Sequence, residues 1–251
     1  MADNFGNIEI KQLSVYRENR KVIDNISFSP EPRSFTALVG KNGCGKSTVV
    51  SCINSMLKYE GEITYGGKKL SAFKKNNRAK FLSVLPQILP RPHITVFDLA
   101  LLGRNPYIGI GKRPTEHDVN AAKLALENIG IYSIADKYLD EISGGECQKA
   151  YLAMIVCQDT EILVLDEPTT YMDISCADEF LSLLCSLKNK TVLTVMHDLN
   201  LAVKYAERIA VLDNGKLIFH GETQKAMSCG IIESVFGVKK YTCGNRTFYG
   251  S

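Results

Sequence analysis

The sequence predicts an α/β fold with a mostly parallel core sheet, and three observations support this prediction. A short apolar run at 36–39 leads into a glycine-rich loop, and the residues after the loop, 48–53, follow a helical pattern. A second apolar run, 162–165, is uninterrupted, which is typical of a parallel strand buried on both faces. From residue 161 onward, strand-like runs alternate with helical segments, as crossover connections between parallel strands require. The core is therefore expected to be a parallel sheet covered by helices.

The N-terminal part of the chain predicts an antiparallel β subdomain. Short runs of β-forming residues alternate there with turn signals such as Tyr65-Gly66-Gly67-Lys68, and these runs occupy 8–10, 22–23, 26–28 and 63–65. The helix after the glycine-rich loop interrupts them. In the last third of the chain, after the run at 162–165, further strand-like runs occur at 191–195 and 209–212.

Residues from about 88 to 158 instead follow a helical pattern, with apolar periodicity at 119–129 and 150–156. We therefore expect one domain, residues 1–251, with a helical subdomain inserted at about 88–158. The core and the β subdomain are expected to occupy about 1–87 and 159–251.

The glycine-rich loop fits the phosphate-binding pattern G-x-x-x-x-G-K-[ST]. In this pattern the glycines let successive backbone N–H groups curl around phosphate oxygens, Lys46 reaches the β- and γ-phosphates, and Ser47 ligates Mg²⁺. A strand before the loop and a helix after it are the context that the motif requires. We expect bound nucleotide to contact the whole motif, Gly40, Lys41, Asn42, Gly43, Cys44, Gly45, Lys46, Ser47 and Thr48.

A second glycine-rich segment comprises Ser143, Gly144, Gly145 and Glu146. It opens onto a helical pattern, so its glycines and the helix N-terminus present N–H groups to an anion. Within a single chain the two glycine-rich segments cannot both contact one nucleotide. The sequence therefore predicts that ATP is enclosed from two sides.

Two carboxylates follow the buried apolar run. Asp166 and Glu167 are expected at the carboxyl edge of a parallel strand, where α/β proteins place ligand-binding groups. Asp166 is expected to hold Mg²⁺ through water, and Glu167 is expected to polarise the attacking water.

With these three motifs in this order, the chain resembles the ATP-binding-cassette (ABC) ATPases. The resemblance implies a Q-loop glutamine at Gln87, which senses Mg²⁺ and water, and a switch histidine at His197, which contacts the γ-phosphate. It also implies a D-loop residue at Asp173 and an aromatic residue at Tyr16 that stacks on adenine. The expected catalytic residues are Glu167, His197, Lys46 and Gln87, and the expected metal ligands are Ser47, Gln87 and Asp166.

Each of these motifs has a structural alternative when taken alone. The Ser-Gly-Gly segment would then be an ordinary turn and helix cap. His197 would be a packed or surface histidine, and Tyr16 would be a half-buried strand residue. Their joint occurrence in one order, from Tyr16 to His197, favours the ABC interpretation.

The resemblance further implies two cofactors, ATP and Mg²⁺, and a head-to-tail dimer of identical subunits in which Ser143 and Gly145 complete the site of the other subunit. It implies multi-span permease subunits as partners, a substrate-binding protein as an indirect partner, and a peripheral position on the cytoplasmic face of the membrane.

Residues 92–107 give the most specific indication of the substrate. A Thr-Val-x-Asp-Leu start at Thr95 is followed by Leu-Gly-Arg-x-Pro-Tyr, and this combination resembles the ATPases of importers for iron–siderophore complexes, haem and cobalamin. In ABC importers this region meets the coupling helix of the permease, so Leu102, Arg104 and Tyr107 are expected to help form the receiving groove. The structural alternative is that Thr95 caps a helix and the Gly-x-x-Pro turn ends it.

Composition excludes several other classes. The chain of 251 residues has 45% hydrophobic and 23% charged residues, which is typical of a folded cytosolic protein, and its net charge of +3 does not favour nucleic-acid binding. We find no apolar stretch of membrane-spanning length and no signal peptide in residues 1–7. The eight cysteines contain no C-x-x-C pair and are expected to be reduced. Cys44 is singled out because loop N–H groups and Lys46 are expected to lower its pKa.

Three alternatives stay open from the sequence. A non-transport ABC ATPase could act on a protein or nucleic-acid partner, an ABC subunit could serve a different cargo, and a catalytically weak relative could act as a nucleotide-dependent regulator. Residues 93–107 argue against the first, and Glu167 and His197 against the last. The sequence leaves the exact cargo, the permease and the direction of transport undetermined.

Overall fold

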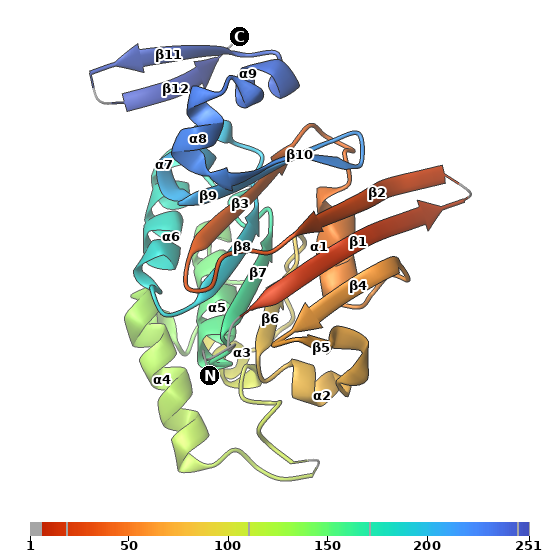
Figure 1. Ribbon diagram of the computed structural model, residues 1–251. Coiled ribbons are helices and arrows are strands. Elements are labelled where there is room, and N and C mark those ends of the chain that lie inside the picture. The colour runs from red at the N-terminus through yellow and green to blue at the C-terminus, as the bar shows by residue number, and fades with distance from the viewer. Residues whose placement is uncertain (1–6, 19, 110, 171, 245, 251) are drawn as a thin grey trace.

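The computed structural model describes residues 7–18, 20–109, 111–170, 172–244 and 246–250. Within these residues the chain forms a central mixed sheet, an antiparallel sheet beside it, and helices on both faces of the central sheet (Figure 1). The predicted α/β class is confirmed. Within the described part of the chain, no helix is both long enough and apolar enough to span a membrane.

The central sheet has the strand order β10-β9-β3-β8-β7-β6, and all neighbours except β10 and β9 are parallel. Its strands are β3 (Phe35–Gly40), β6 (Leu82–Leu85), β7 (Ile162–Asp166), β8 (Thr191–Val195), β9 (Arg208–Asp213) and β10 (Lys216–Glu222). The predicted runs at 36–39, 162–165, 191–195 and 209–212 are all strands of this sheet. Strands β3, β7 and β8 are buried at every position, which explains their uninterrupted apolar character.

The antiparallel sheet has the order β2-β1-β4-β5 and confirms the predicted β subdomain. Its strands are β1 (Ile8–Arg17), β2 (Arg20–Phe28), β4 (Glu60–Tyr65) and β5 (Lys68–Lys69). The runs predicted at 22–23 and 26–28 belong to one strand, β2. Asn25 between them has a positive φ of 52°, and the β1–β2 register shifts on both sides of it, so a bulge produced the apparent break.

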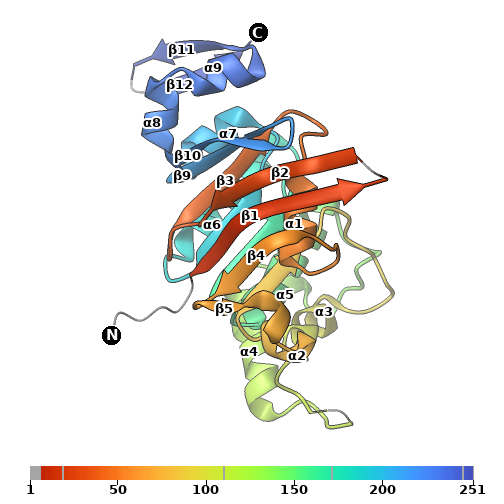
Figure 2. The ribbon, with the colours of Figure 1, turned by 45° about the vertical axis from the view of Figure 1, so that its right-hand side comes forward.

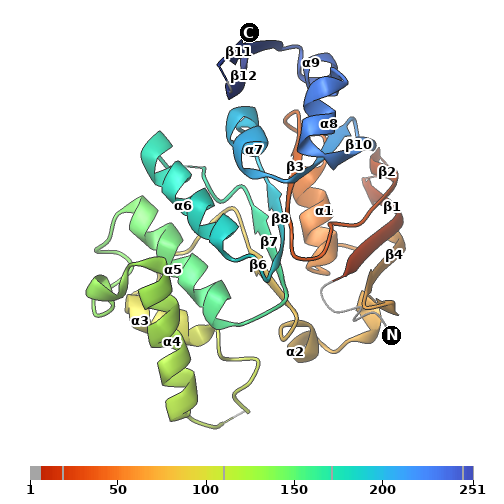
Figure 3. The same ribbon diagram turned by 60° about the vertical axis from the view of Figure 1, so that its left-hand side comes forward.

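Helix α1 (Lys46–Ile53) lies between the two sheets. It is packed in a core that it shares with Leu38 and Val164 from one face of the central sheet and with Ile10 from the antiparallel sheet. The opposite face of the central sheet, with Ala37 and Val39, packs on the other helices. Figure 3 shows this arrangement, with the two groups of elements on opposite sides of the central sheet.

Helices α3 (Val96–Leu102), α4 (Glu116–Ile129) and α5 (Gly144–Cys157) pack against one another on that opposite face. Gly103 allows the end of α3 to approach α5, because a Cβ atom there would lie 2.2 Å from Met154 O. The helices predicted at 119–129 and 150–156 are confirmed. Residues 88–95, 103–109 and 111–114 lie outside helices, so the helical pattern predicted from about residue 88 onward was too extensive.

The remaining helices are short, apart from α6. They are α2 (Lys75–Arg78), α6 (Ile174–Ser186), α7 (Leu199–Tyr205), α8 (Thr223–Ser228) and α9 (Ile231–Phe236), with 3-10 turns at Leu70–Ala72 and Tyr132–Ile134. Gly237 is the C-cap of α9.

A C-terminal hairpin of β11 (Lys239–Cys243) and β12 (Arg246–Gly250) follows α9 and was not predicted. It lies at the opposite end of the molecule from α4 (Figures 1 and 2). The Asn200 side chain on α7 fixes it, because Asn200 accepts from Tyr249 N at 2.7 Å and donates to Tyr249 O at 3.2 Å. This contact joins residues that are 49 positions apart, so no local sequence pattern predicts it.

Arg104 is buried, and the expectation that it forms part of a surface groove is wrong. Its side chain is only 8% exposed, its Nε donates to Asp118 Oδ1 at 3.0 Å, and its Nη1 donates to Cys157 O at 3.1 Å. Hydrogen bonds from Thr115, together with the Arg104 cation, lower the pKa of Asp118 to about 2. Arg104 therefore joins the ends of α3, α4 and α5. Leu102 and Tyr107 do remain exposed.

Replacing Arg104 with Met should destabilise the fold, because it keeps the apolar stem but leaves the buried Asp118 carboxylate without its cation. Removing one partner of a buried ion pair costs about 3 kcal/mol or more. The free energy of unfolding in urea measures the effect, with Met at the exposed Arg113 as the control. A loss no larger than that of the Arg113 variant would contradict the structural role.

Candidate nucleotide-binding site

The phosphate-loop motif connects β3 to α1, as the sequence requires. β3 is buried up to Gly40, and a Cβ atom at that position would lie 2.2 Å from Leu212 O. Gly45 has a φ of 109°, and a Cβ there would lie 2.4 Å from Ile23 Cδ1. Both positions therefore demand glycine, and the backbone between them turns closely enough to surround a phosphate.

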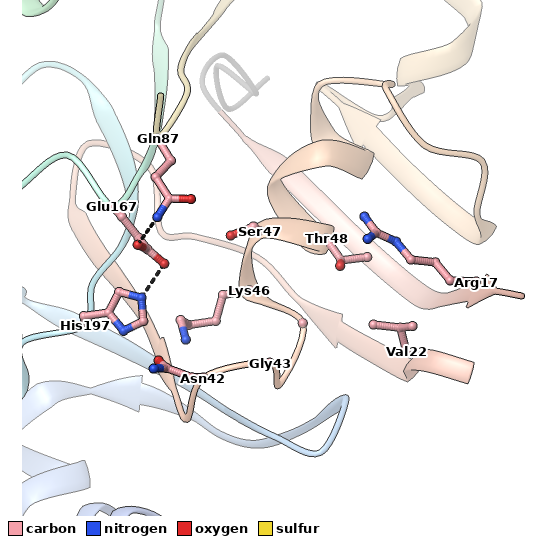
Figure 4. A pocket seen from close by; sticks show the side chains of 11 residues that line it. Arg17, Val22, Asn42, Gly43, Lys46, Ser47, Thr48, Gln87, Glu167 and His197 are labelled. Carbon is pink, nitrogen blue, oxygen red and sulfur yellow. Dashed lines mark hydrogen bonds and ion pairs between the residues drawn. The ribbon is translucent and has the colours of Figure 1, made fainter. Parts of the chain in front are cut away.

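A cavity of about 390 Å³ lies beside this loop, a volume within the range of small-molecule sites (Figure 4). It is bounded by the tip of the β1–β2 hairpin, the loop, the start of α1, and residues that follow β6, β7 and β8. The residues lining it are Arg17, Val22, Asn42, Gly43, Gly45, Lys46, Ser47, Thr48, Gln87, Glu167 and His197.

Lys46 is held in place within the loop. Its side chain is buried, and its ammonium donates to Gly40 O at 2.8 Å and to Lys41 O at 3.1 Å. The loop thus positions a cation at the wall of the cavity, where a phosphate chain would run.

Ser47 and Asp166 form a pair of oxygen groups at the edge of the cavity. Ser47 Oγ donates to Asp166 Oδ1 at 3.1 Å. Burial raises the pKa of Asp166, and the neighbouring Glu167 charge raises it further. A hydroxyl and a buried carboxylate side by side fit Mg²⁺, which is bound by one or two protein oxygens together with phosphates and water. Among the described residues no cluster of three or more His, Cys, Asp or Glu side chains could form an all-protein metal site.

Glu167 is the point at which three segments meet. Its carboxylate accepts a hydrogen bond of 2.5 Å from Gln87 Nε2 and contacts His197 Nε2 (Figure 4). It also lies 3.4 Å from Thr170 Oγ1. The residue is 7% exposed and its backbone has a φ of 53°, a conformation that residues other than glycine seldom adopt. Such strain is found at functional sites, and here it turns the carboxylate toward the cavity.

Tyr16 does not line the cavity. It is 52% exposed on β1, with the Lys21 ammonium 5.7 Å from its ring centroid, and the cavity wall near it is formed by Arg17 and Val22. Neither Arg17 nor Val22 was singled out from the sequence. Neither residue belongs to a recognised motif. The sequence could have indicated them only through their position, because both flank the turn of the hairpin that also carries Tyr16.

The second glycine-rich segment lies outside this cavity. Ser143 is the N-cap of α5, where it forms a capping box with Glu146, and its hydrogen bonds lower the pKa of Glu146. Gly144 and Gly145 form the first turn of the helix. Asp173 caps α6 by accepting from Cys176 N at 2.8 Å and also lies outside the cavity. The structure therefore does not bring the two glycine-rich segments of one chain together at the cavity.

The Cys44 expectation is wrong. The thiol is 5% exposed and packs in the core between the two sheets, and a Cβ at Gly40 would lie 2.5 Å from its Sγ. Burial raises the pKa of Cys44, and this effect exceeds the opposing effect of the Lys46 cation. The backbone of Cys44 belongs to the phosphate loop, but its side chain packs in the core and does not line the cavity, so nucleotide is not expected to protect this thiol.

The fold and the cavity together define a P-loop nucleotide-binding protein. Comparison with known proteins is more specific. Residues 23–170 match the family model described as ABC transporter. The chain therefore belongs to the ABC transporter family, as the sequence resemblance implied, and it is an ATP-hydrolysing subunit of the transport-coupled type.

Similar curated proteins align along most of the chain. The probable siderophore transport system ATP-binding protein YusV of Bacillus subtilis is 33% identical, with 92% of this chain and 86% of that protein covered. The ferric enterobactin transport ATP-binding protein FepC of Escherichia coli is 32% identical, with 95% and 90% covered. An inward-facing structure of a putative metal-chelate type ABC transporter superposes with a TM-score of 0.82 at 24% identity, covering 96% of this chain and 95% of that chain.

Proposed function

We propose that this chain powers the import of iron–siderophore complexes, with haem and cobalamin as the other cargoes of the same importer class. The observation that carries the proposal is the identity of about one third with siderophore-transport ATP-binding proteins over more than nine tenths of the chain. Residues 92–107, which suggested this cargo class, comprise the residues before α3, the whole of α3 and the turn after it.

The nucleotide site is proposed to be completed by a second copy of the chain. The cavity has the loop and Lys46 on one side, whereas Ser143 and the first turn of α5 lie elsewhere on the same chain. In a head-to-tail dimer, the N–H groups of α5 from one subunit would face the γ-phosphate bound by the other. The γ-phosphate then holds the dimer closed, and its loss reopens it.

The hydrolytic roles follow from the contacts at Glu167. Its carboxylate is positioned to orient the attacking water and to receive its proton, while Gln87 and His197 fix the carboxylate from two sides. Lys46 and the loop N–H groups stabilise charge on the phosphates. Mg²⁺ held beside Ser47 and Asp166 would supply further charge neutralisation for phosphoryl transfer. Most of the catalysis is therefore positioning and electrostatics.

The permease is proposed to dock near the end of α3. Leu102 and Tyr107 are exposed there, and the Tyr107 hydroxyl donates to Gln158 O at 3.0 Å. Gln158 in turn lines a cavity of about 190 Å³ that extends to Asn54 at the end of α1. An amphipathic helix of a membrane subunit fits such a groove with a few apolar anchors. Docking there would hold the chain peripherally on the cytoplasmic face of the membrane, with a substrate-binding protein acting only indirectly.

The Glu167→Gln variant should bind ATP but hydrolyse it orders of magnitude more slowly, because Gln keeps the shape and cannot take up the proton. ATP should then trap a closed dimer, which size-exclusion chromatography with and without ATP would detect. Gln at the exposed Glu18 serves as the control. Turnover near the wild-type rate would rule out Glu167 as the general base.

The Leu102→Asp variant should lose uptake while its ATPase activity as a purified subunit stays within about twofold of wild type, because loss of one interface anchor costs binding without reaching the nucleotide site. Leu124→Asp is the matched control, since Leu102 and Leu124 are similarly exposed, at 46% and 57%. Uptake would be measured in cells whose sole copy of this chain is the variant.

The same cells test the cargo. The wild-type chain should restore uptake of a ferric siderophore, and the Leu102→Asp chain should not. Uptake of haem or cobalamin alone would contradict the siderophore assignment, and uptake of none of the three would reject the whole cargo class. Unimpaired uptake by Leu102→Asp would exclude the docking site.

A further inference from the structure

A second cavity, of about 570 Å³, lies at the C-terminal end of α1, and none of the residues that line it also lines the nucleotide cavity. Its volume is larger than the 390 Å³ of the nucleotide cavity and falls within the range of small-molecule sites. Its walls come from the residues after α1, from β4 and β5, and from the segment that ends with α2. β4, β5 and α2 lie together on one side of the molecule (Figures 1 and 2).

We propose that this second cavity, the basic cavity, binds the phosphate group of a phosphate ester through Lys58, Lys69 and Arg78. Two sources share this chemistry, a soluble phosphate ester and the headgroup of an anionic phospholipid, and experiment can separate them. The site has no part in the ATP chemistry and goes beyond the proposed transport function.

The charge of the lining residues favours an anion. Three cations, Lys58, Lys69 and Arg78, line the basic cavity together with one carboxylate, Glu62. Glu62 is paired with Lys69 at 3.1 Å. Among the described residues, neither Lys58 nor Arg78 has a carboxylate within ion-pair distance. Two positive charges in the wall are therefore left without a counter-ion.

The segment around the cavity concentrates positive charge. Residues 58–80 contain seven Lys or Arg residues and two Glu residues, which gives the segment a net charge of +5. The whole chain has a net charge of +3, so the remaining residues together carry −2. A local excess of one sign of charge in a hollow surface raises the local concentration of counter-ions.

The fold does not require these cations at the end of α1. A helix C-terminus attracts cations, but the carbonyl oxygens of residues 50–52 already accept hydrogen bonds from the N–H groups of residues 54–56. Arg78 donates only to the Ser55 hydroxyl, and Lys58 is exposed and forms no hydrogen bond within the described part of the chain. Both side chains thus remain available to a ligand.

The deeper wall of the basic cavity is apolar and favours an ester over free phosphate. Ile63 is buried, and Phe73 packs edge-on against the ring of Phe81 with the centroids 4.9 Å apart. Burial raises the pKa of Tyr59, so its hydroxyl stays protonated and can donate to a phosphate oxygen. An ester would place its phosphate among the cations and its organic part against Tyr59 and Phe73.

The position of the basic cavity makes a lipid headgroup one of the two sources. Arg78 also lines the cavity of about 190 Å³ that contains Gln158. Gln158 donates to Ala79 O at 2.6 Å, and its carbonyl accepts from Tyr107 at the proposed docking site of the permease. Docking there would bring the basic cavity close to the membrane surface, where anionic headgroups are concentrated. The lipid source therefore rests on the proposed docking, whereas the soluble source does not.

The test uses the purified full-length chain saturated with Mg-ADP, so that the phosphate loop is occupied. The soluble probe is sn-glycerol 3-phosphate, measured by titration calorimetry. The lipid probe is phosphatidylglycerol vesicles, measured by co-sedimentation, with phosphatidylcholine vesicles as the neutral reference. The variant Lys58→Met/Arg78→Met removes the two unpaired cations.

The matched control is Arg113→Met/Lys188→Met, which removes the same charge. Arg113 and Lys188 are exposed, form no ion pair within the described ranges, and do not line the basic cavity. The wild type should bind at least one anionic probe. Lys58→Met/Arg78→Met should bind it at least about tenfold more weakly, because each basic residue contributes roughly fivefold near an anionic surface. The control should stay within about twofold of the wild type.

Binding of sn-glycerol 3-phosphate would identify a soluble ester as a source, and binding of phosphatidylglycerol but not phosphatidylcholine vesicles would identify the lipid. Binding of neither probe by the wild type would overturn the inference. Equal weakening in the two double variants would also overturn it, because net charge and not a site would then account for the binding. Either negative result leaves the transport function untouched, since neither probe involves the permease.

A single variant covers the case in which Lys58→Met/Arg78→Met does not fold. Lys58→Met removes no hydrogen bond, so it should fold and should weaken binding about fivefold relative to Lys188→Met. Equal binding by these two single variants would contradict the site.

Discussion

The rest of the site depends on the position of the Glu167 carboxylate at the end of β7. Three constraints fix it. β7 is buried between two parallel neighbours, Glu167 N donates to Val195 O on β8 at 3.2 Å, and the backbone then enters a left-handed conformation at Glu167 itself. A strand that continued in extended form would carry the next side chain to the other face of the sheet. The strained turn instead leaves the carboxylate between Gln87 and His197.

The layers of the fold support the proposal that one chain makes only part of the site. The central sheet packs α1 and the antiparallel sheet on one face and α3, α4 and α5 on the other. The phosphate loop and the capped start of α5 are therefore built on different layers. Within the loop Lys46 donates to Gly40 O, and at the start of α5 Ser143 donates to the Glu146 carboxylate. A second copy is the simplest way to bring one against the other.

Sequence patterns predicted the parts whose chemistry is local. Buried parallel strands produce uninterrupted apolar runs, and the phosphate loop needs glycine where a Cβ would collide, so both produce a recognisable sequence pattern.

The predictions that were wrong or missing concern residues whose positions depend on contacts with distant parts of the chain. Arg104 looked like a surface group because its partner Asp118 and the Cys157 carbonyl belong to other helices. Cys44 was mispredicted for a different reason. The motif correctly places its backbone in the phosphate loop but does not predict that its side chain packs in the core. Arg17 and Val22 reach the cavity only through the pairing of β1 with β2.

The central claim, that each ATP site is shared between two chains, is tested most directly by mixing two inactive variants. Lys46→Ala removes the phosphate-binding cation from a chain's own cavity, and Ser143→Arg blocks the start of α5. In a head-to-tail dimer of one chain of each kind, the intact Lys46 of one chain faces the intact Ser143 of the other. ATPase activity should therefore appear in the mixture although neither variant has it alone. A mixture that stays as inactive as its two components would contradict the shared site.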